Sequence, residues 1–364
     1  MGSGSEIKLG NRELISIILI ASGAKLADTT PSLLINDAKT AIWIVPLVAG
    51  TIMFLFFYLA YKVVSKNQNK NLIEVSVDLF GPLVGNMLGF ILFLFVFITL
   101  IVDLRGYVNN LATMHYPQTP LIVLLVFFLG GVLYNARRGL EAIGSVFYVS
   151  VFYIKISILV LAILIIIYSR WQSMFPLLGG GFFSILKQGI EKASIFGDLF
   201  LVLVIYPFIQ NKKSLLKVVT GTTAFLMMEI AFFYLIYIML FGYPFMERIT
   251  YPFHESAKYV KIGTFASHVE TFFLFFWLVA SLLRFSFYLY CSAIIFGTIT
   301  KIKEFEPIII PLSVITLIFS LYPENPADNT FFVRNIIFAT ISLGLMGYSV
   351  LLWTTDKIKG RKSK

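Results

Sequence analysis

The first strongly apolar stretch of the sequence, residues 14–34, is interrupted in its middle by small, hydroxylated and charged residues. Ser22, Gly23 and Ala24 stand where a membrane helix is normally most apolar, and a lysine and an aspartate follow them. Because lipid offers backbone groups no hydrogen-bond partner, unwound chain survives at membrane depth only inside protein or beside a cavity. Interrupted helices of this kind are typical of transporter binding sites near the bilayer midplane. The sequence therefore predicts a ligand-binding site at this break.

A second break is predicted in the second half of the chain, at Phe196, Gly197 and Asp198. A half-helix that begins after a break presents free N–H groups, which suit a carboxylate. One that stops before a break presents free carbonyls, which suit an ammonium group. A zwitterionic amino acid satisfies both. The alternative is that Ser194 caps an ordinary helix and Asp198 lies in its first turn.

Several ionisable residues lie inside predicted spans, where each costs about 2.5 to 3.5 kcal/mol on insertion scales. Lys155 lies well inside the fifth span, so it must face an acid, carbonyl groups or water, and it is a candidate to replace the cation of a sodium-coupled transporter. Lys25 and Asp28 are three residues apart on one helical face, so they form either a structural pair or part of the site. We expect four side chains to contribute to coupling or an ion path: Lys25, Lys155, Glu229 and Arg284.

The third span carries an acid and a base, Asp103 and Arg105. They are two residues apart, so they point to different sides of the helix and are not expected to pair. Arg105 either snorkels to the outer membrane surface or has a functional role.

The composition is that of an integral membrane protein: of 364 residues, 58% are hydrophobic and 13% are charged. At about 20 apolar residues per crossing, we predict an all-α polytopic fold with ten transmembrane helices. The predicted spans are residues 14–34, 41–64, 83–108, 120–134, 143–168, 193–209, 218–241, 265–298, 307–322 and 331–353. Five spans per half make the second half enter the membrane from the opposite side, which is the condition for an inverted repeat. We expect one transmembrane domain over residues 6–356, with repeats at about 11–168 and 190–353 and with helices 1 and 6 discontinuous.

The formal charge of +10 follows the loops. If the N-terminus is cytoplasmic, 17 of the 29 lysines and arginines fall on inner segments, 8 on outer segments and 4 within spans. This bias predicts that both termini are cytoplasmic and that the number of spans is even. Residues 357–364 form a basic cytoplasmic tail, which is either a positive-inside flank or a contact for anionic membrane lipid. No nucleic-acid partner is expected.

The sequence lacks the residues that disulfide, metal, nucleotide-binding and catalytic sites need. A single cysteine and three dispersed histidines offer neither a disulfide framework nor metal-ligand spacing, so no metal or other cofactor is expected. The glycine run at 179–181 lacks the lysine and hydroxyl residue of a nucleotide-binding loop. No catalytic constellation is present, so we do not expect an enzyme. Residues 1–5 are interpreted as an expression scar.

The order and spacing of short motifs over nearly the whole chain resemble one family of membrane proteins. These motifs are residues 8–23, Asn71-Leu72-Ile73-Glu74, Asp103-Leu104-Arg105-Gly106-Tyr107, Gln118-Thr119-Pro120, residues 136–141, Phe196-Gly197-Asp198, Tyr206-Pro207-Phe208, residues 277–290 and Tyr322-Pro323-Glu324-Asn325. The sequence is similar to the spore germination permeases, the membrane-embedded B subunits of bacterial spore germinant receptors, within the amino acid/polyamine/organocation superfamily.

The resemblance implies the fold of amino acid permeases, with a ligand between helices one, three, six and eight. It also implies separate A and C subunits as partners and a location in the inner membrane of spores. Gly23 is followed by Ala24-Lys25, which departs from the Gly-x-Gly pattern of these permeases and bears on the identity of the ligand. The implied ligand-binding residues are Ser22, Gly23, Ala24, Thr99, Asp103, Phe196, Gly197, Asp198, Ser286 and Tyr290.

Three functions are compatible with the sequence, because one fold serves all of them. The first is a germinant-sensing subunit that binds an amino acid or similar small nutrient and triggers germination, by signalling to its partners or by opening an ion path. The second is an autonomous amino acid transporter, either proton-coupled or sodium-independent. The third is a structural membrane subunit with a vestigial pocket.

Overall fold

The computed structural model describes residues 8–67, 69–260, 269–322 and 333–362. These residues are almost all helical, and among them the only β-type pairing is an isolated bridge between Leu9 and Ile209. The structure confirms the predicted all-α fold. Residues 1–5, interpreted as a scar, and the Pro323-Glu324-Asn325 motif lie outside the described residues.

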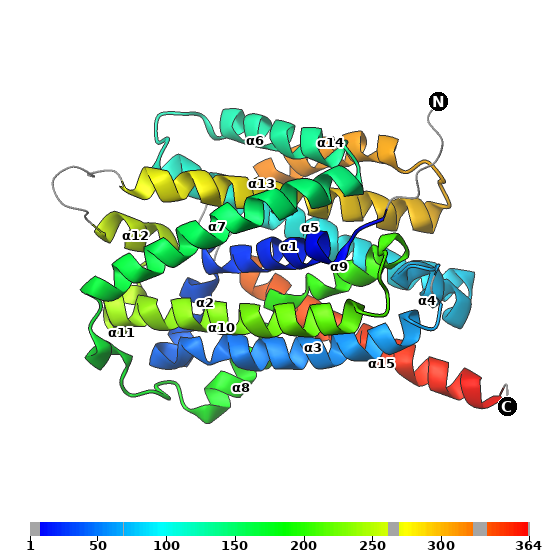
Figure 1. Cartoon of the computed structure of the whole chain (residues 1–364), viewed down its shortest axis with the longest axis horizontal. Helices are drawn as coiled ribbons and strands as arrows, with labels where there is room; N and C mark the ends of the chain where they lie inside the picture. Colours follow the sequence, from blue (N-terminus) through cyan, green and yellow to red (C-terminus); the bar gives the residue numbers. More distant parts are fainter. Residues whose placement is uncertain (1–7, 68, 261–268, 323–332, 363–364) are drawn as a thin grey trace.

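Six described helices are long and apolar enough to cross a membrane. They run along the long axis of the molecule (Figure 1). α6 (Leu121–Ala136) and α14 (Ile309–Leu321) are shorter apolar helices that pack on each other. The chain is therefore a multi-pass membrane protein, and the count of ten spans stays a prediction. The six long helices are α3 (Val45–Val64), α5 (Pro82–Met114), α7 (Leu140–Tyr168), α10 (Leu215–Phe241), α13 (Val269–Thr300) and α15 (Arg334–Lys362).

The first predicted span is broken, as expected. α1 (Asn11–Ala21) ends at the small residues, the 3-10 turn η1 (Gly23–Leu26) follows, and α2 (Thr30–Ala38) continues into η2 (Lys39–Trp43). The two parts are bent by 56°. Pro31 lies in the first turn of α2, a position where the missing N–H costs no helical hydrogen bond.

The sixth span is also discontinuous, but its first half begins at Phe182 instead of residue 193. α8 (Phe182–Glu191) precedes the break, η4 (Ala193–Phe196) forms it, and α9 (Leu199–Val204) and η5 (Tyr206–Phe208) follow. The ten residues of α8 mix apolar side chains with Lys187, Gln188 and Glu191. Averaged hydrophobicity therefore hides this half-helix.

Short helices close the two ends of the bundle. α4 (Leu72–Phe80) lies at the end where α15 terminates, and α11 (Tyr243–Met246) and α12 (Pro252–Tyr259) lie at the opposite end (Figure 1). α1 begins at the same end as the α15 terminus, which is the arrangement that an even number of crossings produces. The remaining connections contain η3 (Trp171–Met174) and η6 (Glu306–Ile308).

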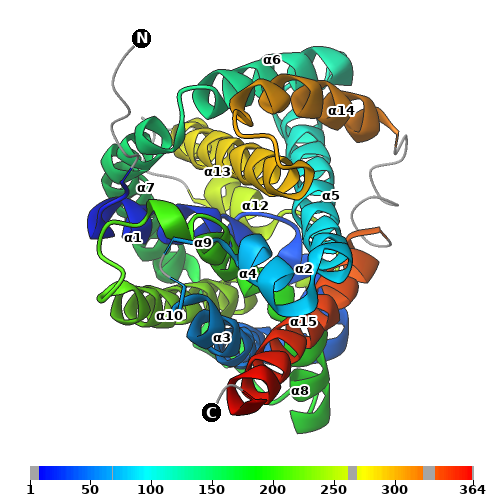
Figure 2. The same ribbon diagram turned by 90° about the vertical axis from the view of Figure 1, so that its right-hand side faces the viewer.

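The broken segments lie inside the bundle. Viewed along the helices, α6 and α14 form one side, and α3, α8 and α15 form the opposite side (Figure 2). Every residue of α9 is buried, and η4 packs against α3 and α15. The fold thus holds both breaks in its interior, where the surrounding protein must satisfy their polar groups.

Candidate ligand-binding site

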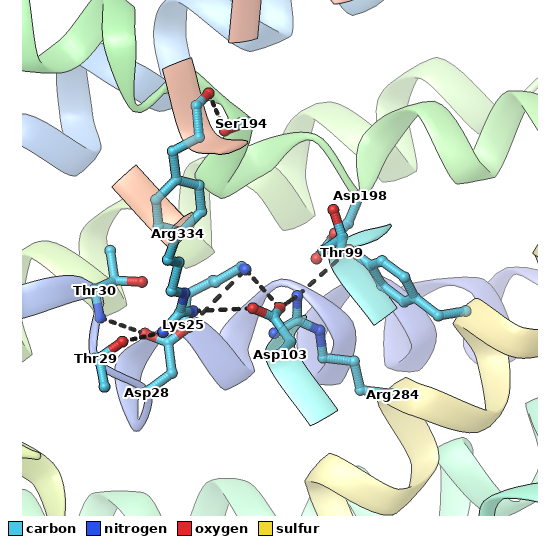
Figure 3. A network of polar contacts seen from close by, with 12 residues as sticks. Lys25, Asp28, Thr29, Thr30, Thr99, Asp103, Ser194, Asp198, Arg284 and Arg334 are labelled. Atoms are coloured by element: carbon cyan, nitrogen blue, oxygen red, sulfur yellow. Dashed lines mark hydrogen bonds and ion pairs between the residues drawn. The ribbon is translucent and has the colours of Figure 1, made fainter. Parts of the chain in front are cut away.

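Six ionisable side chains meet between the two breaks, and we call them the charge cluster. The first break contributes a lysine and an aspartate, the second an aspartate, and α5, α13 and α15 one residue each (Figure 3). Arg284 is the sixteenth of the 32 residues of α13, so the cluster lies near the middle of that helix. Its members are Lys25, Asp28, Asp103, Asp198, Arg284 and Arg334.

Asp103 on α5 is the centre of the cluster. Its Oδ2 atom lies 3.1 Å from the Nζ atom of Lys25 and 2.8 Å from an Nη atom of Arg284. Its Oδ1 atom lies 3.3 Å from an Nη atom of Arg334. One carboxylate therefore links the first break to two helices of the second half of the chain.

The other two carboxylates extend the cluster to the breaks. Asp28 accepts a hydrogen bond from Arg334, and its Oδ2 atom lies 3.9 Å from the Nζ atom of Lys25. Asp198 accepts a hydrogen bond from the hydroxyl of Tyr288, which lies 3.4 Å from an Nη atom of Arg284. Three cations thus face three anions, and the described cluster is formally neutral.

The cluster is deeply buried. The side chains of Lys25, Arg284 and Asp103 are 1%, 3% and 8% exposed, respectively. Taking such charges out of water carries a penalty of several kcal/mol per ion, which is offset only when partners and hydrogen bonds are well placed. The ion pairs of the cluster offset part of that penalty, and loss of one member leaves a buried charge unpaired.

Two cavities lie on opposite sides of the cluster along α5. The α9 cavity, about 40 Å³, is lined on α5 by residues 92–103 and across from them by Gly197, Asp198 and Tyr288. The Trp277 cavity, about 30 Å³, is lined on α5 by residues 103–110. Asp103 and Arg334 line both cavities, so the cluster separates them.

Three backbone groups at the first break are bonded by side chains, whereas helix ends alone would leave them free. The Thr30 N–H at the start of α2 donates to Oδ1 of Asp28 at 2.7 Å. The carbonyls of Lys25 and Leu26 each accept a hydrogen bond at 3.2 Å, from the hydroxyls of two tyrosines on α10, Tyr234 and Tyr237. At these three groups, the protein's own side chains make the hydrogen bonds that the sequence prediction assigned to a zwitterionic ligand.

The structure brings together most of the predicted ligand-binding residues near the breaks. Thr99, Asp103, Gly197 and Asp198 line the α9 cavity. Gly23 and Ala24 line a third cavity, the Lys155 cavity, which has a volume of about 30 Å³ and lies between the first break, α7 and α13. Ser22 is buried, and its hydroxyl has no hydrogen-bond partner among the described residues. Phe196 is buried but faces Gly50 on α3 and lines none of these cavities.

The two predicted residues on α13 lie on a different face of that helix. Ser286 donates to the carbonyl of Val132 at 3.1 Å, and the ring of Tyr290 packs against Phe305 with centroids 5.5 Å apart. A step of two residues turns a helix by about 200°. Arg284 and Tyr288, rather than Ser286 and Tyr290, therefore reach the cluster.

The remaining intramembrane charges are paired separately. Lys155 faces an acid, as expected: its Nζ atom lies 2.5 Å from Oε2 of Glu229 on α10. A Cβ atom at Gly23 would lie 3.4 Å from that Nζ atom, so the pair borders the first break. Arg105 does not pair with Asp103, and it is buried and donates to the carbonyl of Ser320 at 3.0 Å instead of snorkelling.

Sequence reasoning missed Arg334 and Tyr288. Arg334 opens the tenth predicted span, where a cation is typical of a loop flank, so its position gives no sign of a site. Tyr288 lies four residues after Arg284, and this spacing places the two on one face. Among the described residues, no group of His, Cys, Asp or Glu has the arrangement of a metal site.

Solved transporter structures share this fold. The chain superimposes on MhsT in complex with L-phenylalanine with a TM-score of 0.67 at 12% identity, covering 96% of this chain and 93% of MhsT. It superimposes on Mhp1, a nucleobase-cation-symport-1 family transporter with bound bromovinylhydantoin, with a TM-score of 0.61 at 12% identity, covering 98% and 94%. The fold is therefore that of these inverted-repeat transporters, as the sequence predicts, while five helices in each repeat stay a prediction.

Sequence relatives identify the family. Spore germination protein KB of Bacillus subtilis is 23% identical over 297 residues, which are 80% of this chain and 78% of the relative. Spore germination protein GerQB of Bacillus cereus is 23% identical over 235 residues, 59% of this chain and 64% of the relative. The family model described as spore germination protein matches residues 12–329. The chain therefore belongs to the spore germination protein family of membrane permeases.

Proposed function

We propose that the chain is the membrane-embedded germinant-sensing subunit of a spore germinant receptor. In this proposal it binds an amino acid or similar small nutrient beside the breaks of helices 1 and 6 and acts with separate A and C subunits in the spore inner membrane. Both termini face the spore core, in keeping with the charge bias of the loops. The family and the permease fold support this assignment.

The observation that carries the proposal is the neutral charge cluster between two cavities. A zwitterion adds no net charge, so it can enter the cluster without leaving a charge unbalanced. Its carboxylate competes with Asp103 for Lys25 and the arginines, and its ammonium group competes with them for the aspartates. The ligand thus exchanges partners with the protein instead of filling empty helix ends.

Such an exchange provides a trigger. Each protein ion pair that the ligand replaces is a contact between the breaks and the long helices, so occupancy changes the relative free energies of two arrangements of the bundle. A ligand shifts that equilibrium only by its differential affinity for the two states. Loss of the contacts through Asp103 would connect the two cavities and open an ion path. No catalytic step is assigned.

The alternative is an autonomous proton-coupled or sodium-independent amino acid transporter. The specific observation in its favour is the pair of cavities on opposite sides of one buried cluster, an arrangement compatible with alternating access. The pairing of Lys155 with Glu229 beside the first break supports the sodium-independent version, because an ammonium group stands there in place of a metal cation.

Reconstitution into liposomes tests the two functions against each other. For a receptor subunit we expect saturable ligand binding by the purified chain, no amino acid uptake by the chain alone, and ligand-dependent ion flux once A and C subunits are added. Concentrative, saturable uptake without partners would refute the receptor-only assignment. A thermal-shift screen against amino acids, sugars and nucleosides identifies the ligand to be used.

A further inference from the structure

The Trp277 cavity contains a buried carboxamide with no hydrogen bond. Asn110 on α5 is 1% exposed and lines this cavity. Neither its amide nitrogen nor its amide oxygen has a partner among the described residues. Because buried polar groups are almost always hydrogen-bonded, an amide left with both its donor and its acceptor unused requires a ligand or water as its partner.

Two further donors, on arginines that line the same cavity, also have no partner among the described residues. The Nε atoms of Arg284 and Arg334 have no hydrogen-bond partner among the residues described, although the other guanidinium nitrogens bind the carboxylates of the cluster. Both arginines line the Trp277 cavity. The cavity thus combines N–H donors with a carboxamide that can both donate and accept.

Four aromatic residues also line the cavity, beside small and acidic residues: Tyr107, Tyr251, Trp277 and Phe285. The rings of Tyr107 and Trp277 stack with centroids 4.0 Å apart and planes 28° from parallel. The cavity is about 30 Å³, so it admits a small planar group, and a larger ligand must widen it.

We propose that the Trp277 cavity is a recognition subsite for the amide group of the ligand, with Asn110 as its specificity residue. An amide is planar and carries one donor next to one acceptor, so it pairs with the Asn110 carboxamide through two hydrogen bonds, beside the aromatic residues that line the cavity. Its oxygen also suits the free Arg284 and Arg334 N–H donors. The shared chemistry is –CO–NH–, which occurs in a side-chain carboxamide and in the ring of a nucleobase.

This inference rests on the proposed function, since it names the chemistry that the sensed nutrient must carry. It also explains why no ionic group is needed in this cavity. The carboxylate and the ammonium group of a zwitterion balance each other in the neutral cluster, so a further ionic group in this cavity would leave a buried charge unbalanced, whereas an amide adds hydrogen bonds alone.

Matched ligand pairs test the subsite on the full-length chain in lipid nanodiscs by isothermal titration. L-Asparagine is compared with L-leucine, which has a similar shape without the amide, and hypoxanthine is compared with purine, which lacks the ring oxygen. We expect the amide-bearing member of one pair to bind at least about tenfold more tightly than its partner. Preference in the first pair identifies a side-chain carboxamide, and preference in the second identifies a ring amide.

Asn110→Leu should reduce that preference to less than about twofold. The matched control is Asn109→Leu, since Asn109 is the neighbouring and equally buried asparagine but does not line the cavity, and it should retain the preference. Ligand-free Asn110→Leu should unfold at or above the wild-type temperature, because the change removes an unpaired amide. If Asn110→Leu fails to fold, Asn110→Ala replaces it.

Three results would overturn the subsite: no amide preference in the wild type while leucine or another amino acid binds, a preference that survives in Asn110→Leu, or equal loss in Asn109→Leu. These results leave the proposed function intact. If the wild type binds none of these probes and responds to no amino acid, both the proposed function and this inference fail.

Discussion

Replacement of Arg284 by methionine is expected to destabilise the protein strongly, because it leaves three anions facing two cations in the charge cluster. The guanidinium is 3% exposed and lies 2.8 Å from Asp103, so little solvent is available to screen the charge that loses its partner. Breaking a buried ion pair from one side typically costs about 3 to 5 kcal/mol. Arg284 also lies 3.4 Å from the hydroxyl of Tyr288, and the mutation removes this hydrogen bond as well. We therefore expect the loss in the free energy of unfolding to fall within that range rather than below it.

A double-mutant cycle combines this change with a second mutation, which removes the opposite charge at Asp103. Asp103→Asn alone leaves three cations facing two anions and should cost a similar amount. The double variant Arg284→Met/Asp103→Asn restores two of each sign, so we expect it to be no less stable than either single variant. The coupling energy between the two positions should therefore be at least about 2 kcal/mol.

The free energy of unfolding is measured by denaturant titration in detergent micelles, followed by tryptophan fluorescence. Lys66→Met is the control, since Lys66 also forms a close pair, at 2.5 Å from Asp356, but is 60% exposed. An exposed pair contributes about 0 to 1 kcal/mol. If Arg284→Met destabilises no more than Lys66→Met, or if the double variant loses the sum of both single losses, the cluster does not act as one balanced unit.

Three further predictions concern the surroundings of the cluster. Gly23→Ala should change the free energy of unfolding by no more than about 1 kcal/mol, since the added Cβ makes ordinary contacts. The longer side chain of Gly23→Leu should reach Lys155 and abolish ligand-induced thermal stabilisation. Unchanged ligand-induced stabilisation in Gly23→Leu would refute the placement of the pocket. Glu229→Gln should cost about 1 to 3 kcal/mol by leaving Lys155 without its acid, and adding Lys155→Met should recover most of the loss; no recovery would contradict the pairing. Burial and neighbouring positive charge lower the pKa of His254 in α12 to about 3. As the pH falls below about 6.5, the unfolded chain therefore binds a proton before the folded chain does, and the free energy of unfolding should decline from there towards pH 3. Melting curves of His254→Asn should lack this pH-dependent decline, and a variant with the same pH slope as the wild type would exclude it.

Local composition was sufficient to predict both breaks, because a continuous helix in lipid rarely carries glycine and charge together in the middle of its apolar run. The partners of those charges follow from tertiary packing, which spacing in the sequence does not reveal. Lys25 pairs with Asp103, which is 78 residues away in the sequence. Arg334 lies where a cation is typical of a loop flank. The prediction that Ser286 faces the pocket was wrong for a related reason. Ser286 and Arg284 are both plausible pocket residues in the sequence, and only the packing of α13 against α5 and α6 determines which of them faces the cluster.

The distribution of charge between the two predicted repeats gives the proposed ligand binding a means of coupling to movement. Lys25, Asp28 and Asp103 lie in the first predicted repeat and together carry one net negative charge, while Asp198, Arg284 and Arg334 lie in the second predicted repeat and carry one net positive charge. Neither group of three charges is electrically neutral without the other group. Any motion that separates the repeats therefore pulls opposite charges apart at low dielectric, where their attraction is large. A zwitterion supplies both signs at once, so it can compensate each half during that separation, and a ligand of one sign cannot.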